Sequence, residues 1–478
     1  MTQQLKSLVH AWIDNHTEMI LDSHNKIWSW AEVGLHEDKS SAHLADMLEN
    51  WGFSVERGVA GMPTAFVATF GSGKPVIGLL AELDALPGLS QTVTTSPDPL
   101  IPGGAGHGCG HNSYAATAAG SAIALKEAML QAGLSGTIKC FGCPAEETVT
   151  GKVFMVRDGY FDGLDAVLGH HPGSSNGVGL GSSNAMNSVK FEFFGKASHA
   201  AGSPEQGISA LDAVELMNTG VNYMREHIIQ EARIHYVIEE GGHEPNVVPA
   251  YARSWYYVRA PTRALVEEYY DRILKIADGA DLMVGTTHKV RFLTGVHNTI
   301  QNHPLARLVT QNMREIGAPE YTLEELAFAR EIGTSVQKDA KRARLERSYL
   351  PDAIELLDVD LNRRIYEPYG EERKGGGGST DVAEVSWKAP TVEFNTAQFV
   401  VGAPGHSWQH TAISGSTIGH KSTLFAAKAM AATVIDMLSE PRYLNEIKSD
   451  WDEQMQGLEY HSPLPENLAP PLDQLAAS

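Results

Sequence analysis

The sequence Gly106-His107-Gly108-Cys109-Gly110-His111-Asn112 decides how the rest of the chain is interpreted. Three glycines alternate with side chains that can bind a ligand. Glycine removes side-chain bulk and permits unusual dihedral angles, so the chain can wrap closely around something small. Thiolate and imidazole together suit zinc or another borderline metal ion. The stretch therefore predicts a metal site, and the alternative is a glycine-rich surface turn with incidental histidines.

The composition is that of an ordinary globular protein with enough chain for two domains. Of the 478 residues, 42% are hydrophobic and 20% are charged. The 37 basic and 58 acidic residues give a net charge of −21, which argues against a nucleic acid or an anionic membrane as partner. The beginning of the chain has no signal-peptide pattern, and no apolar run is long enough for a membrane span. We therefore expect a cytoplasmic protein.

Alternating strand and helix patterns predict an α/β fold. Three short apolar stretches, at 76–81, 136–143 and 166–169, are typical of buried strands. Each leads into potential ligands, namely Glu82 and Asp84, Glu146 and Glu147, and His170 and His171. Sheets of this class place their sites at the carboxyl ends of the strands. We expect a mixed sheet flanked by helices, with its chemistry at that edge.

The pattern changes between residues 186 and 298. Here the expected elements are strand 188–194, helix 209–227, strands 233–239 and 252–258, helix 265–279 and strand 288–294. The order βαββαβ is that of a ferredoxin-like unit. We therefore expect an inserted domain at 186–298, and a discontinuous metal-binding catalytic domain formed by 1–185 and 299–478.

Several segments of the catalytic domain carry weaker signals. One amphipathic helix is expected over residues 5–20, and another over 416–438. The charge-rich stretch 330–347 is interpreted as solvated helix or loop, and 375–378 as a flexible glycine loop. Residues 399–406 are expected to run from a strand into a loop, and the proline-rich tail beyond Ser462 to be extended or disordered.

The two residues of an adjacent pair of potential ligands cannot both point into the same site. In extended backbone, neighbouring side chains point to opposite sides. One of Glu146 and Glu147 can therefore bind a metal while the other stays free as a base, although a solvated turn is the alternative. By the same argument at least one of His170 and His171 is structural. His406 follows a glycine in a loop, as a late ligand or an ordinary surface histidine would.

The chain has only three cysteines, and two of them form the C-x-x-C sequence Cys140-Phe141-Gly142-Cys143. Three cysteines are no disulfide framework. A redox pair normally opens a helix, whereas this one ends an apolar strand. We prefer buried, inert thiols and keep a redox protein as the alternative.

Taken together, the motifs resemble the metal-dependent amidohydrolases of the aminoacylase and carboxypeptidase group, and within it the subgroup whose ligand loop contains His-x-Cys-Gly-His. The similarity covers nearly the whole chain. It includes the stretches at 82–87, 107–112, 144–147, 171–172, 195–200, 245–249, 259–261, 379–382 and 406–408. The chain departs from the subgroup at Glu82, at Asn112, and at Thr148 and Val149.

The resemblance implies a site for two divalent metal ions, zinc or manganese. Its ligands would be Cys109, His111, Glu147, His171 and His406. Glu146 would be the catalytic base, and Asp84 the carboxylate that orients a ligand. The inserted domain would act as a lid and dimerise. Its His199 would polarise the scissile carbonyl, often across the dimer, and Asn246 and Arg259 would bind the polar end and carboxylate of the substrate.

The activity implied is hydrolysis of N-acyl amino acids, with p-aminobenzoyl-glutamate as first candidate substrate. Dipeptides and other acyl-amino acids are alternatives. A further alternative is a protein that is active only with a homologous partner chain, so both a homodimer and a heterodimer with such a chain are expected possibilities. The presence of every matched ligand and of the base argues against an inactive relic.

Overall fold

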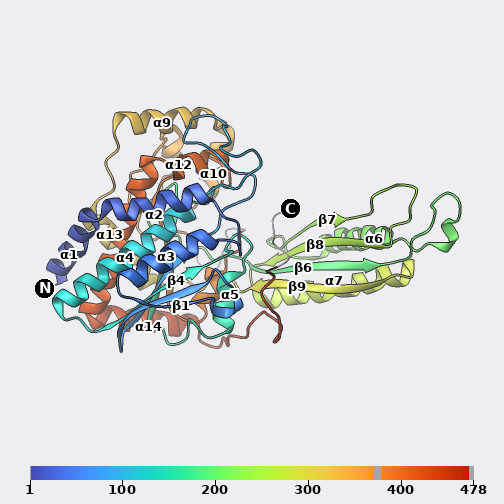
Figure 1. Cartoon of the computed structure of the whole chain (residues 1–478), viewed down its shortest axis with the longest axis horizontal. Coiled ribbons are helices and arrows are strands. Elements are labelled where there is room, and N and C mark those ends of the chain that lie inside the picture. The colour runs from blue at the N-terminus through green and yellow to red at the C-terminus, as the bar shows by residue number, and fades with distance from the viewer. Residues whose placement is uncertain (1, 371–377, 473–478) are drawn as a thin grey trace.

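Two separate sheets organise the chain. The computed structural model describes residues 2–370 and 378–472. In Figure 1, one sheet lies inside a thick layer of helices, and the other extends to the side as a narrow arm with two helices of its own. The predicted fold class, a mixed sheet flanked by helices with an inserted ferredoxin-like unit, is confirmed.

The first sheet has six strands in the order β1-β2-β4-β3-β5-β10. Their bounds are β1 Ser54–Arg57, β2 Phe66–Ser72, β3 Val76–Glu82, β4 Gly136–Cys143, β5 Ala166–Gly173 and β10 Thr391–Ala397. The strands β4, β3, β5 and β10 run parallel, whereas β1 and β2 pair antiparallel. The carboxyl ends of four strands therefore meet at one edge.

Both faces of this sheet are covered, which explains why its strands read as nearly continuous apolar runs. On one face, Leu79, Ile138 and Leu168 pack in a core with several helices. On the other face, Leu80 and Phe141 pack in a second core. The helices of the first core are α1 Thr2–Asn15, α2 Thr17–Trp30, α3 Asp38–Asn50, α4 His111–Ala132, α8 His303–Ile316, α13 Thr417–Ser439 and α14 Pro441–Gln454. Those of the second are α5 Gly151–Arg157 and α11 Val382–Ser386.

The arm contains a four-stranded antiparallel sheet in the order β7-β8-β6-β9. Its elements are β6 Ala185–Phe194, α6 Ala210–Met224, β7 Arg233–Glu240, β8 Tyr251–Ala260, α7 Arg263–Val284 and β9 Thr287–Val296. They follow the βαββαβ order expected from the sequence. Both helices pack on one side of the sheet around a separate core.

A separate helical segment between residues 323 and 358 supports the loop that follows β10. It comprises α9 Leu323–Thr334, α10 Lys338–Arg347 and the short 3-10 helix Ala353–Asp358. Lys341 packs directly on Gly402, and Arg344 donates a hydrogen bond to the carbonyl of Gly402. This segment therefore fixes the loop 398–407, which ends at α12 Trp408–Ser414.

The structure corrects some element boundaries. The expected opening helix is two helices, which break at His16. The strand expected at 166–169 continues to Gly173, so His170 and His171 belong to it. The strand before His406 ends earlier than expected, at Ala397. The glycine loop lies mostly outside the described residues, and none of the described helices is long and apolar enough to cross a membrane.

Close packing between β2 and β4 gives a test of this fold. Gly142 pairs with Phe66 across β2 and β4, and a methyl group at Gly142 would lie 2.1 Å from the buried ring. We expect Gly142→Ala to lower the free energy of unfolding by about 1–3 kcal/mol through overpacking, measured by urea denaturation. As control, a methyl at Gly279 in α7 meets no atom within 4 Å, so Gly279→Ala should not destabilise. Equal stability of both variants would contradict the pairing of Gly142 with Phe66.

Candidate active site

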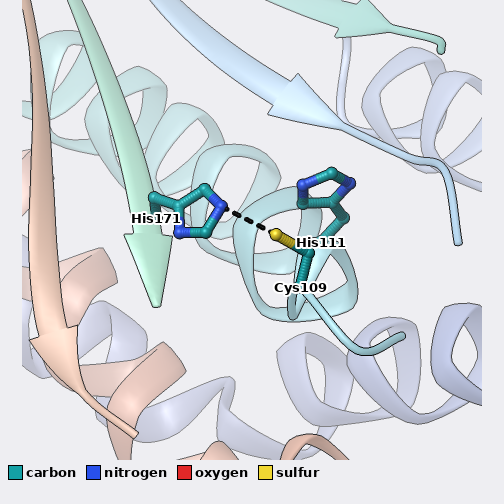
Figure 2. A group of neighbouring side chains, drawn as sticks. All are labelled: Cys109, His111 and His171. Carbon is teal, nitrogen blue, oxygen red and sulfur yellow. Dashed lines mark hydrogen bonds between the residues drawn. The ribbon is translucent and has the colours of Figure 1, made fainter. Parts of the chain in front are cut away.

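The glycine-rich loop brings Cys109 and His111 to the carboxyl edge of the first sheet. Figure 2 shows the Cys109 side chain, just before α4, directed at His171 of β5, with the ring of His111 beside it at the start of the helix. The Cys109 Sγ lies 3.2 Å from His171 Nε2. Between the two loop residues, Gly110 has φ +82°, and a Cβ there would lie 3.0 Å from Pro172. Glycine is therefore required for the turn that directs both side chains inward.

A second set of side chains meets the first at Cys109. The ligand atoms of Cys109, His111 and His171 lie within 4.8 Å of one another, and so do those of Cys109, Glu147 and His406. His406 Nε2 is 3.5 Å from Glu147 Oε2. The five residues implied as metal ligands are thus brought together from the strand ends, the glycine-rich loop and the loop after β10.

The geometry of His111 fits a cation. Its Nδ1 lies 2.9 Å from the carbonyl oxygen of Asp84 and 3.2 Å from Asp84 Oδ1, which fixes the ring. Metal-binding histidines are held in this way through their other nitrogen. Burial lowers the pKa of His111, but Glu82 and Asp84 outweigh it, so the net shift is upward. The site therefore attracts positive charge.

In this cluster, the buried Glu147 Oε1 has no hydrogen-bond partner among the described residues, and the buried His111 Nε2 has only the Glu82 carboxylate nearby, at 3.2 Å. Burial raises the pKa of Glu147 to about 8 and also raises that of the Cys109 thiol. Unpaired buried donors and acceptors are rare in folded proteins. Bound divalent ions would satisfy both atoms and stabilise the thiolate and carboxylate forms.

The adjacent glutamates point to different neighbours, but they do so from a turn rather than from the extended backbone that the sequence argument assumed. Glu147 faces Cys109 and His406, whereas the nearest histidine to Glu146 is His111, with 4.0 Å between Oε2 and Nε2. Asp84 Oδ2 accepts a hydrogen bond from the Glu147 backbone N–H at 2.9 Å. Asp84 therefore contacts both His111 and the backbone of Glu147, in keeping with an orienting role.

A buried ion cluster behind His111 was not recognised in the sequence. Lys152 Nζ lies 2.8 Å from Glu82 Oε1 and 2.5 Å from Asp381 Oδ1, and all three side chains are buried. Although burial lowers the pKa of Lys152, Asp381 and Glu82 outweigh it. Glu82 also approaches His111 Nε2 to 3.2 Å. The available signal was a single lysine followed by the apolar run 153–156.

Removing the cation of this cluster would leave two buried carboxylates without a counter-charge. We expect Lys152→Met, which keeps most of the volume, to lower the free energy of unfolding by about 3–5 kcal/mol. Urea denaturation measures it. Lys448 is the control, because its pair with Asp452 is solvent-exposed and Lys448→Met should cause no measurable change. A Lys152→Met protein as stable as the wild type would contradict the pairing of Lys152 with the two buried carboxylates.

The other residues singled out in the sequence have structural surroundings. His170 is buried and lies 2.7 Å from Thr396 Oγ1. His107 is buried against the carbonyl of Ile27, and burial lowers its pKa to about 3. Cys140 and Cys143 are buried free thiols, and burial raises the pKa of Cys140 to about 12. Such thiols have little thiolate character, so the redox alternative finds no support.

The three arm residues are not assembled with the metal cluster within one chain. His199 and Asn246 are exposed on loops 195–209 and 241–250, which join in an isolated bridge at the far end of the arm (Figure 1). Arg259 lies in β8 near the other end, opposite Met186. Its Nε has no hydrogen-bond partner among the described residues, and burial lowers its pKa.

Residues 78–435 match the sequence model of Peptidase family M20/M25/M40. The chain belongs to this family. It is 39% identical to a subunit of the p-aminobenzoyl-glutamate hydrolase of Escherichia coli K12, over 98% of this chain and 99% of that protein. It is 28% identical to the mouse Xaa-Arg dipeptidase, over 93% and 91% of the two chains.

The fold is shared with a solved peptidase of family M20 from Bacillus subtilis, described as dinuclear metal-binding. The TM-score is 0.55 with 18% identity, and the match covers 89% of this chain and 99% of that one. Family membership and the cluster of ligands identify the chain as a metal-dependent hydrolase that acts on amide bonds. The resemblance recognised in the sequence is thus confirmed.

Proposed function

We propose that this member of family M20/M25/M40 hydrolyses the amide bond of N-acyl amino acids, with p-aminobenzoyl-glutamate as the preferred substrate. The products would be p-aminobenzoate and glutamate. The observation that carries the proposal is the 39% identity to the Escherichia coli hydrolase chain along nearly the whole of both chains. A dipeptide substrate is the second candidate, because the similarity to the Xaa-Arg dipeptidase also spans most of the chain.

The proposed cofactor is a pair of divalent ions, zinc or manganese. The described residues form three groups of potential ligand atoms. Two of them share Cys109, with His111 and His171 in one and Glu147 and His406 in the other, which supports two neighbouring ions, and the third is Glu82, His111 and Glu146. Thiolate and imidazole favour zinc, while carboxylate and imidazole equally suit manganese. When bound, such ions acidify a water molecule and polarise the substrate carbonyl.

Glu146 is the proposed catalytic base. It stands beside the ligand cluster, and the nitrogen of His111 lies 4.0 Å from its carboxylate. In this role Glu146 takes a proton from the attacking water and passes it to the leaving amine. Asp84 contacts both His111 and the Glu147 backbone, so that Glu146 and the proposed ligands keep their relative positions.

The substrate-binding residues of the arm are proposed to act from a second chain. His199 Nδ1 accepts hydrogen bonds from the N–H groups of Ala201 and Gly202, so the proton lies on Nε2, which can donate to a developing oxyanion. Arg259 is proposed to bind the carboxylate of the substrate. The edge strand β7 exposes Val237 and Ile238, which supports pairing of the arm with another chain.

The first experiment is hydrolysis of p-aminobenzoyl-glutamate, acetyl-amino acids and dipeptides by purified protein with added zinc or manganese. Glu146→Gln should lower kcat by about 10²–10⁴-fold, because it removes the base. The exposed Glu453 provides the control Glu453→Gln, which should not change kcat. Chelation should abolish turnover, and added metal should restore it.

The panel also separates the alternatives. Faster turnover of dipeptides than of p-aminobenzoyl-glutamate would reject the preferred substrate. A protein that binds two ions but cleaves nothing alone would require a homologous partner chain. A protein that binds no metal would contradict the ligand set.

A mixing experiment tests whether His199 acts across the dimer. We expect His199→Ala to lower kcat by about 10²–10³-fold. Equal co-expression with Glu146→Gln should then recover about a quarter of wild-type activity, because half the dimers are mixed and each has one complete site. A mixture as inactive as its components would place His199 in the site of its own chain.

A further inference from the structure

The loop that carries the paired glutamates is held in a conformation that its sequence does not favour. Ala145 has φ +55° and Val149 has φ +56°. Left-handed backbone is costly for residues with a Cβ, and especially for a β-branched residue. Such conformations persist only where the surroundings fix them. The loop that contains Glu146 therefore depends on outside contacts.

The contact at the beginning of this loop is Glu37. Its side chain is fully buried in the segment before α3, far from the loop in sequence. Glu37 Oε1 accepts a hydrogen bond from the Ala145 N–H at 2.8 Å, and Oε2 accepts one from Thr64 Oγ1 at 2.8 Å. Both carboxylate oxygens are thus occupied, and one of them holds the strained residue directly.

The contact on the other side of Glu146 is Asp84, which accepts the N–H of Glu147. Two carboxylates therefore hold the backbone amides on either side of Glu146. Asp84 also orients His111, so its effects on metal binding and on the loop are inseparable. Glu37 is different, because its carboxylate accepts from Ala145 and Thr64, and neither belongs to the ligand set.

We propose that Glu37 is a positioning residue for the reaction: by holding the N–H of Ala145, it fixes the strained turn that directs Glu146 at the attacking water. The proposal rests on the proposed role of Glu146 as base. Glu37 acts through the backbone and does not touch the substrate. What matters is a hydrogen-bond acceptor at this place rather than a negative charge.

This distinction gives a pair of variants. In Glu37→Gln the amide oxygen still accepts from Ala145, and the NH2 group can donate to the Thr64 hydroxyl. Glu37→Ala removes both bonds and leaves the Ala145 N–H unpaired. We expect kcat of Glu37→Gln to stay within about threefold of wild type, and that of Glu37→Ala to fall by about 10- to 100-fold with KM nearly unchanged, as for a small misplacement of a catalytic group.

A double variant tests the link to backbone strain. Glycine adopts positive φ without a Cβ clash, so Ala145→Gly lowers the cost of the turn. Ala145→Gly in the Glu37→Ala background should therefore restore part of kcat. The control is Asp436→Asn, because Asp436 is another buried carboxylate, bonded to Lys6 and Asn312 and outside this loop. It should lower thermal stability and leave kcat unchanged.

Amide hydrogen exchange of the peptide that spans 144–150 provides a readout that does not need activity. We expect faster exchange in Glu37→Ala, and wild-type exchange in Glu37→Gln. Wild-type kcat and exchange in Glu37→Ala would overturn the proposal. An equal loss in Glu37→Gln would overturn it as well, because charge rather than the hydrogen bond would then be required. A wild type without turnover on its own would bear on the proposed function, as described above, and not on Glu37, because the exchange data would still decide whether Glu37 holds the loop.

Discussion

Concentration of charge in a buried place is the constraint on which the rest of this molecule depends. Thiol, imidazole and carboxylate groups meet at one edge of the first sheet, where Glu82, Asp84 and His111 are buried behind the half-buried Cys109, Glu147 and His171, and only His406 is exposed. Burial of unpaired charge is unfavourable, so each group needs a partner. Asp84 pairs with His111, and Lys152 pairs with Glu82 and Asp381. The atoms of the ligand cluster that stay unpaired are those that a metal ion would satisfy.

The parallel strands bring the charged and metal-binding groups together. Their ends bring residues that are distant in sequence to one edge, while the apolar faces of the same strands build two cores. The ligands lie at the strand ends and in the loops beyond them, so the buried middle of each strand can stay apolar. Rigid packing then keeps the ligands in place, as in other sites built on regular elements. The arm has a separate core, so it can carry the proposed substrate-binding residues without disturbing the proposed metal ligands.

Much of this architecture could be predicted from the sequence, because local pattern and tertiary structure agree there. The apolar run 136–143 coincides with β4, and the order of elements in the arm was found from their periodicity. The pattern failed where polar residues are buried. The strand β5 was ended too early because His170 and His171 look like loop residues, although His170 lies in the core.

The candidate site also contains residues that could be predicted from the sequence and residues that could not. Cys109 and His111 were singled out from the alternating glycines, and His406 and the adjacent pairs at 146–147 and 170–171 from their places after a glycine or a strand. The family resemblance then chose Glu147 and His171 within the pairs. Lys152 and Glu37 were missed because lysine in a helix and glutamate beside Asp38 are usually solvated. Their roles arise from contacts between segments distant in the chain, which composition and spacing do not contain. The position of the arm relative to a second chain is likewise absent from local pattern.

The order of the ligands along the chain has a consequence for biosynthesis. Of the proposed ligands, Cys109, His111, Glu147 and His171 come before the arm, but His406 follows the whole arm and the helical segment that supports its loop. A chain emerging from the ribosome therefore exposes an incomplete ligand set until synthesis is nearly finished. Closing so long a segment is also slow. For the proposed ligand set, this order would delay metal acquisition until the C-terminal part has folded, and a truncated chain would lack His406.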